Sequence, residues 1–268
     1  MKVYLSADIE GVAGISAWEE LDRSSPEFHQ FSDLMTEEVV AACSGARAAG
    51  TGEVVVQDAH WLGRNLLLAR LPDYVRIVRG WSGHPLYMLQ DLDESFQAVM
   101  FVGYHGAAQT DVSPVGHTYG GRNVFSLTIN GHAGSEFLIN SWAAELMKVP
   151  VAFISGDEEI CGIAKELNPD ILAVPVSRGN GPSSSSLSPM LARRTIRDMA
   201  EKALRGELAS CRIALPDHFD MEIVFTNPGH ARRAAWYPSA RLAGPRTVRF
   251  STGSYFEILR AIQFLLAR

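Results

Sequence analysis

The run Val3-Tyr4-Leu5-Ser6-Ala7-Asp8-Ile9-Glu10-Gly11 decides the fold of this chain. Its apolar first half is typical of a buried strand, and two carboxylates follow where that strand ends. Residues two apart on a strand project to the same side, so we expect Asp8 and Glu10 to point the same way. Neighbouring buried anions repel each other and lose hydration, and a divalent metal ion offsets both costs. Two solvated acids at a strand end are the alternative interpretation.

The composition is that of an ordinary globular protein. The chain has 268 residues, of which 47% are hydrophobic and 20% charged, and its net charge of −6 gives no sign of a basic surface for nucleic acid. The three cysteines, Cys43, Cys161 and Cys211, are widely spaced, which favours reduced thiols over a disulfide framework. Neither a signal peptide nor an apolar stretch of membrane-spanning length is present, so we expect a cytoplasmic protein with no membrane partner.

Apolar runs alternate with helical patterns along most of the chain. This alternation predicts an α/β fold with a mostly parallel sheet and flanking helices, a Rossmann-like core. A Gly/Ser-rich stretch over 177–188 is expected to be a flexible surface loop. A basic amphipathic helix and short strands follow it. We therefore predict an α/β metal-binding catalytic domain over residues 1–190 and a smaller α+β domain over residues 191–268.

Potential metal ligands recur where predicted strands end. Besides Asp8 and Glu10, His60 follows the strand predicted at 53–57 and His105 follows the strand predicted at 95–103. Ligands bind outside the carboxyl ends of strands in open α/β sheets, so agreement at three strand ends predicts a metal site. Carboxylate and imidazole without thiolate suit zinc in an open catalytic site or a two-metal site.

Motifs of other catalytic classes are not found at the positions after strands where they would indicate a function. The first strand is not followed by Gly-x-Gly-x-x-Gly, and the chain has neither a P-loop nor a Gly-x-Ser-x-Gly elbow after a strand. These absences count against dinucleotide-binding and serine-hydrolase functions.

The chain resembles the D-aminopeptidases of the DppA type, a family of zinc metallopeptidases. The likeness begins with Ser6-x-Asp8-x-Glu10-Gly11 and covers nearly the whole chain, more weakly after residue 190. Its further motifs are Met35-Thr36-Glu37-Glu38, Asp58-Ala59-His60, Asn65-Leu66, Gly103-Tyr104-His105, His117, Ile129-Asn130, Glu136 and Gly156-Asp157.

The resemblance implies a site with two zinc ions per chain. In that pattern Asp8 bridges the ions, and the remaining ligands are Glu10, His60, His105 and Glu136. Glu136 also falls at a predicted helix start, where an acid that favours the helix dipole is the alternative interpretation. The resemblance makes His117 a catalytic residue, either nucleophile or acid/base, although a surface-loop histidine is the plainer reading.

The function that follows is zinc-dependent aminopeptidase activity on short peptides with an N-terminal D-residue. The resemblance also implies a ring-shaped homo-oligomer. The loops around His117 and Arg178 depart from the family pattern, which leaves the substrate preference open. Two alternative functions also stay open. One is a binuclear amidohydrolase acting on another amide, such as a cell-wall fragment, a β-amino peptide or an L-peptide. The other is a non-catalytic peptide-binding or transport-associated protein.

Overall fold

The apolar half of the decisive run forms an interior strand of a seven-stranded sheet. The computed structural model describes residues 1–266, and the strand order of this sheet is β3-β2-β1-β4-β7-β8-β9. Every neighbouring pair is parallel except β8 and β9. The bounds are β1 (Lys2–Ala7), β2 (Glu53–Asp58), β3 (Val75–Val78), β4 (Ala98–Tyr104), β7 (Val151–Asp157), β8 (Leu172–Asn180) and β9 (Ser183–Ser186).

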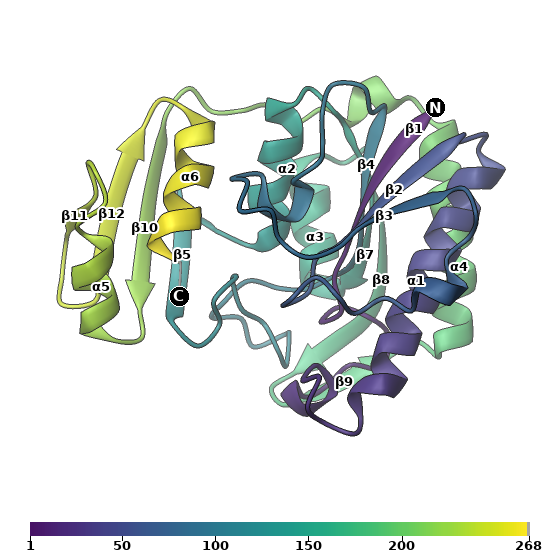
Figure 1. The fold of residues 1–268 in the computed structure, drawn as a ribbon, viewed down its shortest axis with the longest axis horizontal. Coiled ribbons are helices and arrows are strands. Elements are labelled where there is room, and N and C mark those ends of the chain that lie inside the picture. The colour runs from purple at the N-terminus through teal and green to yellow at the C-terminus, as the bar shows by residue number, and fades with distance from the viewer. Residues whose placement is uncertain (267–268) are drawn as a thin grey trace.

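Helices cover both faces of this sheet (Figure 1). Side chains alternate across β1, so Val3 and Leu5 join a core with α1 (Phe28–Ala48) and α4 (Pro189–Arg205). Tyr4 joins the core on the opposite face, which is covered by α2 (Glu136–Leu146) and α3 (Glu158–Leu167). Near-continuous apolar strands follow from burial on both faces. The predicted α/β fold with flanking helices is confirmed.

A second, antiparallel sheet lies beyond α2 (Figure 1). Its strand order is β11-β12-β10-β5-β6, and α6 packs between it and α2 through Tyr255, whose ring contacts Trp142 of α2 and Phe219 of β10. The bounds are β5 (Val124–Ile129), β6 (His132–Ala133), β10 (Phe219–Phe225), α5 (Pro228–Ala234), β11 (Arg241–Leu242), β12 (Thr247–Thr252) and α6 (Tyr255–Leu265).

The two sheets interleave along the sequence. Strands β5 and β6 precede residue 190 yet pair in the second sheet, and α4 follows residue 188 yet packs on α1. The domain division at residue 190 stays a prediction, and residues 267 and 268 of the smaller unit lie outside the described residues.

One local expectation is wrong. The stretch 177–188 is not a flexible loop. Strand β8 continues to Asn180, the chain turns, and the serines of β9 pair with residues 177–180 of β8 to form a hairpin. Ser186 also accepts the backbone N–H of Gly14, so the hairpin contacts the loop after β1. Four short 3-10 helices complete the described chain: η1 (Trp18–Glu20), η2 (Leu68–Arg70), η3 (Tyr87–Leu89) and η4 (Leu208–Cys211). Within residues 1–266, no helix has the length and apolar character needed to cross a membrane.

Candidate metal centre

The loop after β1 holds two buried carboxylates against β4. Asp8 is 2% exposed and Glu10 is 6% exposed. The backbone N–H of Asp8 donates to Val102, and the N–H of Gly11 donates to Gly103. Gly103 must be glycine here, because its φ is +73° and an added Cβ would lie 2.3 Å from the carbonyl oxygen of Asp8. Close contact between the two backbones therefore sets where both acids point.

His60 arrives from the end of β2 and meets both acids. Its Nδ1 lies 2.9 Å from Oε1 of Glu10 and 3.6 Å from Oδ1 of Asp8. Its Nε2 lies 3.3 Å from the carbonyl oxygen of Leu21, which can only accept, so Nε2 carries the hydrogen. In the neutral ring, Nδ1 is unprotonated and faces the two carboxylates, so either a proton or a metal ion at Nδ1 would offset the repulsion between the lone pairs.

The backbone that carries His60 is supported by Asp58. The Asp58 carboxylate accepts the N–H of Asn65, the N–H of Leu66 and the Asn65 amide, while that amide also donates to the carbonyl of His60. This network closes the loop after β2 around a single buried side chain and so limits the positions that His60 can occupy.

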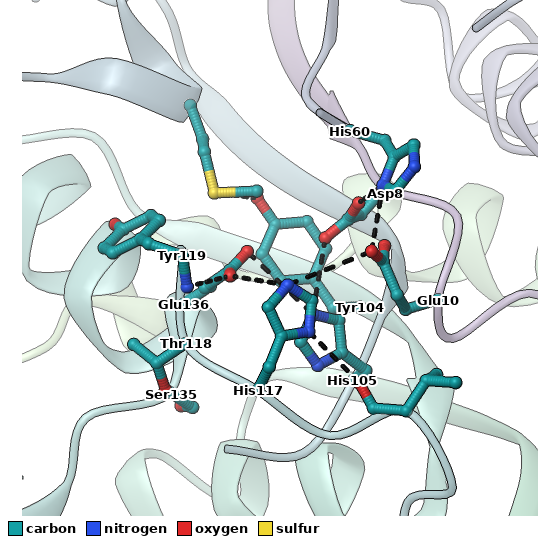
Figure 2. Close-up of polar contacts among 12 residues, drawn as sticks. Asp8, Glu10, His60, Tyr104, His105, His117, Thr118, Tyr119, Ser135 and Glu136 are labelled. Carbon is teal, nitrogen blue, oxygen red and sulfur yellow. Dashed lines mark hydrogen bonds and ion pairs between the residues drawn. The ribbon is translucent and has the colours of Figure 1, made fainter. Parts of the chain in front are cut away.

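His105, at the end of β4, approaches the other oxygen of Asp8. Its Nδ1 donates to the carbonyl of Gly106 over 2.8 Å, which leaves Nε2 unprotonated in the neutral ring. That Nε2 is buried, has no hydrogen-bond partner, and lies 3.7 Å from Oδ2 of Asp8 and 3.9 Å from Oε2 of Glu136. Asp8 thus directs one oxygen to His60 and the other to His105 (Figure 2).

Glu136 is the first residue of α2 and is 4% exposed. Ser135 caps the helix by accepting the N–H of Leu138, and Oε1 of Glu136 accepts the N–H of Tyr119 over 2.6 Å. The helix start explains the local preference for an acid, and the tertiary fold turns that acid toward His105. Oε2 of Glu136 therefore faces Nε2 of His105.

His117 completes the group from the loop between β4 and β5. Its Nε2 lies 3.8 Å from Oε1 of Glu136 and 4.0 Å from Oε1 of Glu10, and its Nδ1 lies 3.1 Å from the carbonyl of Val115. Its side chain is 14% exposed, against 1% to 8% for the other residues of the group, so His117 is the member most open to solvent.

The acids and imidazoles of this group shift one another's pKa values. Burial and the neighbouring Glu10 carboxylate hold the pKa of Asp8 well above its usual range. Against burial, which lowers it, the surrounding carboxylates raise the pKa of His105 to about 9 and raise the pKa of His60 well above its usual range. Burial and His105 lower the pKa of His117. A divalent cation would offset the repulsion among the acids without protonating the imidazoles.

The residues present fit zinc. Ligand atoms of Asp8, Glu10 and His60 lie within 4.8 Å of one another, as do those of Asp8, His105 and Glu136. The orphaned Nε2 of His105 and Oε2 of Glu10 are the buried lone pairs that a metal ion would satisfy. A third such set joins Glu10, His105 and His117. Imidazole with carboxylate and no thiolate is the donor set of catalytic zinc sites.

The structure brings together all six residues named from the sequence. Four of them, namely Asp8, Glu10, His60 and His105, are predicted from their positions at strand ends. Glu136 and His117 came only from the family resemblance, because a helix start and a loop carry no strand-end signal. A capping serine directly before an acid was the local sign available for Glu136.

Three comparisons with known proteins point to the same family, and each match covers nearly the whole chain. A model of the D-aminopeptidase family matches residues 1–264. The D-aminopeptidase of Bacillus subtilis (strain 168) is 29% identical over 265 residues, which are 98% of this chain and 95% of that protein. The solved structure of the Zn-dependent D-aminopeptidase DppA from Bacillus subtilis, described as a self-compartmentalizing protease, has a TM-score of 0.90 and 27% identity. That match covers 99% of this chain and 96% of the other.

Proposed function

This chain belongs to the D-aminopeptidase family, and we propose that it hydrolyses short peptides with an N-terminal D-residue at a pair of zinc positions that share Asp8. The chain is a metallo-aminopeptidase, a hydrolase acting on peptide bonds. The observation that supports a paired site is the orientation of the Asp8 carboxylate, whose Oδ1 faces His60 and whose Oδ2 faces His105.

Each zinc position has three protein ligands in this proposal. Asp8, Glu10 and His60 would hold one ion, and Asp8, His105 and Glu136 would hold the other. Three protein ligands leave a coordination position open, which distinguishes a catalytic zinc site from a closed structural one. The hydrogen bonds from His60 to Leu21 and from His105 to Gly106 would orient the two rings toward the ions.

When bound, the zinc ions supply Lewis-acid polarisation of the scissile carbonyl and lower the pKa of water. Burial of the carboxylates excludes bulk water from the centre. His117 is the open member of the group, and its lowered pKa favours the neutral ring with an unprotonated Nε2 directed inward. Nε2 would therefore accept a proton from the attacking water and then deliver it to the leaving amine.

The assembly and location belong to the same proposal. The related DppA structure is described as self-compartmentalizing, which supports a homo-oligomer here, and we propose that it is a closed ring. The three cysteines are free and buried, which is compatible with the reducing cytoplasm.

The test combines metal content with substrate choice. Protein purified without chelator is assayed for zinc per chain and for alanine release from D-Ala-D-Ala and L-Ala-L-Ala. We expect about two zinc ions and D-selective, chelator-sensitive hydrolysis. Zinc without cleavage of either dipeptide would redirect the function to another amide. Folded protein without zinc and without activity would overturn the proposal.

A further inference from the structure

Three aromatic residues near the metal centre have a backbone conformation that bulky residues rarely adopt. Trp61, Tyr87 and Tyr119 have φ values of 45°, 47° and 52°. Each such conformation costs free energy and persists only where the surroundings enforce it, most often at functional sites. Trp61 is 40% exposed and the two tyrosine rings are half-buried, so burial of the rings alone does not explain why the strain is kept.

The three residues are joined through Trp81 into one connected aromatic bridge, which we define as Trp61, Trp81, Tyr87 and Tyr119. The indole N–H of Trp81 donates to the carbonyl of Trp61 over 2.6 Å. The Trp81 and Tyr87 rings stack with centroids 4.3 Å apart, and Tyr87 meets Tyr119 edge to face at 5.2 Å. The bridge therefore runs without interruption from the loop after β2 to the loop before β5.

Both ends of the bridge adjoin residues of the candidate metal centre. Trp61 directly follows His60, and its loop is held to the Trp81 segment by the hydrogen bond from the N–H of Gly80 to the carbonyl of Gly63. At the other end, the backbone N–H of Tyr119 donates to Oε1 of Glu136. Figure 2 shows this end, with the Tyr119 nitrogen directed at the Glu136 carboxylate.

The middle of the bridge is anchored, through Met88, to the strand that leads to Asp8. Met88 follows Tyr87 in η3, and its carbonyl accepts the hydroxyl of Ser6, two residues before Asp8. Ser6 also hydrogen-bonds Tyr104 over 2.7 Å, and the Met88 sulfur lies 3.2 Å from the Asn140 amide of α2. Through Met88, the bridge thus reaches Ser6 in the strand that leads to Asp8 and Asn140 in the helix that begins with Glu136.

From this arrangement we propose that Trp81 and Tyr87 are positioning residues, which hold His60 and Glu136 at the spacing that two zinc ions require. The inference rests on the proposed two-metal site and extends it to two residues outside the ligand groups. The bridge acts through the backbone of Trp61 at one end and of Tyr119 at the other. Loss of one link should therefore loosen both ends together.

The experiment compares four single variants of the full-length protein and the double variant that combines Trp81→Phe with Tyr87→Leu. Trp81→Phe removes the indole N–H, and Tyr87→Leu removes the aromatic stack. Tyr87→Phe keeps the ring contacts, and Trp236→Phe changes a tryptophan that is 88% exposed and outside the bridge. Zinc affinity is measured by chelator competition, ligand geometry by the absorption spectrum of the cobalt-substituted protein, and kcat and KM on the dipeptide that wild type cleaves.

For Trp81→Phe and Tyr87→Leu we expect about tenfold weaker zinc binding, a changed cobalt spectrum and a lower kcat with little change in KM. The double variant should lose less than the product of the two single effects, because both break one connection. Tyr87→Phe should stay closer to wild type than Tyr87→Leu, and Trp236→Phe should match wild type.

Purely structural packing would give a different pattern, namely a lower unfolding temperature with zinc affinity and cobalt spectrum equal to those of Trp236→Phe. That result would overturn the inference. Wild-type protein lacking zinc and activity would instead contradict the proposed function, so the two failures are distinguishable.

Discussion

The rings of His105 and His117 are stacked, with centroids 4.5 Å apart and planes 6° from parallel. Both rings have Nδ1 directed at a backbone carbonyl, so both direct Nε2 toward the carboxylates. They differ in depth, since the side chain of His105 is 1% exposed and that of His117 is 14% exposed. The stack therefore places the more open imidazole against the buried one, which supports the proposed roles of His117 in proton transfer and of His105 in metal binding.

Replacing His117 should remove proton transfer and keep the metal. For His117→Ala we expect kcat to fall by about 10²- to 10⁴-fold, because proton delivery to the leaving amine is lost. Zinc content should stay at the wild-type value. His132→Ala changes an exposed histidine of β6 and serves as the control. A loss of zinc in His117→Ala would instead make His117 a ligand, together with Glu10 and His105.

Replacing the shared carboxylate should cost more metal than replacing an unshared ligand. Asp8 belongs to both ligand groups, whereas His60 belongs to one. Asp8→Ala should therefore leave less than one zinc per chain, and His60→Ala should leave about one, as measured by elemental analysis. Equal losses in the two variants would show that Asp8 does not bridge.

Glu38 of α1 should make stability fall as pH rises. Burial raises the pKa of this carboxyl from 4.5 to about 8, against the lowering effects of the Ala13 N–H and Arg193. The folded state therefore keeps a proton that the unfolded chain releases above about pH 4.5. This contribution is complete below the unfolded pKa and is lost as pH approaches 8.

Glu38→Gln keeps the shape and the acceptor for Ala13 but does not titrate. Relative to wild type, its free energy of unfolding should increase with pH across that window by up to about 1.4 kcal/mol per pH unit. Urea unfolding of both proteins at several pH values measures the difference. A constant difference between pH 5 and 8 would mean that buried Glu38 does not carry the shifted titration.

The glycine behind Asp8 should not tolerate a side chain. In Gly103→Ala the new Cβ would meet the carbonyl oxygen of Asp8 in a left-handed backbone conformation, and we expect a loss of about 3 kcal/mol of stability together with weaker zinc binding. Gly162→Ala lies in α3 with open space around the new Cβ and should stabilise by up to about 1 kcal/mol. Thermal unfolding of both variants tests the contrast, and equal stabilities would contradict it.

Much of the fold follows from local patterns in the sequence. The apolar runs predict the parallel strands because burial on both faces of a sheet demands continuous apolar residues. The serines at 183–186 gave a misleading signal, since their backbone pairing in the β8–β9 hairpin does not depend on apolar side chains. The pairing of β5 with β10 joins residues far apart in sequence, and no local pattern encodes such long-range contacts.

From the sequence alone, Asp8, Glu10, His60 and His105 are placed at the carboxyl ends of three predicted strands, because strand period and the alternation of strands with helices follow from the apolar pattern. That these strands lie side by side, as β2, β1 and β4, follows from the tertiary fold. Only the tertiary structure decided that the two oxygens of Asp8 face different histidines and that Glu136 closes the second group. The physical reason is that these relations depend on backbone contacts between distant segments, such as Gly103 against Asp8 and Tyr119 against Glu136.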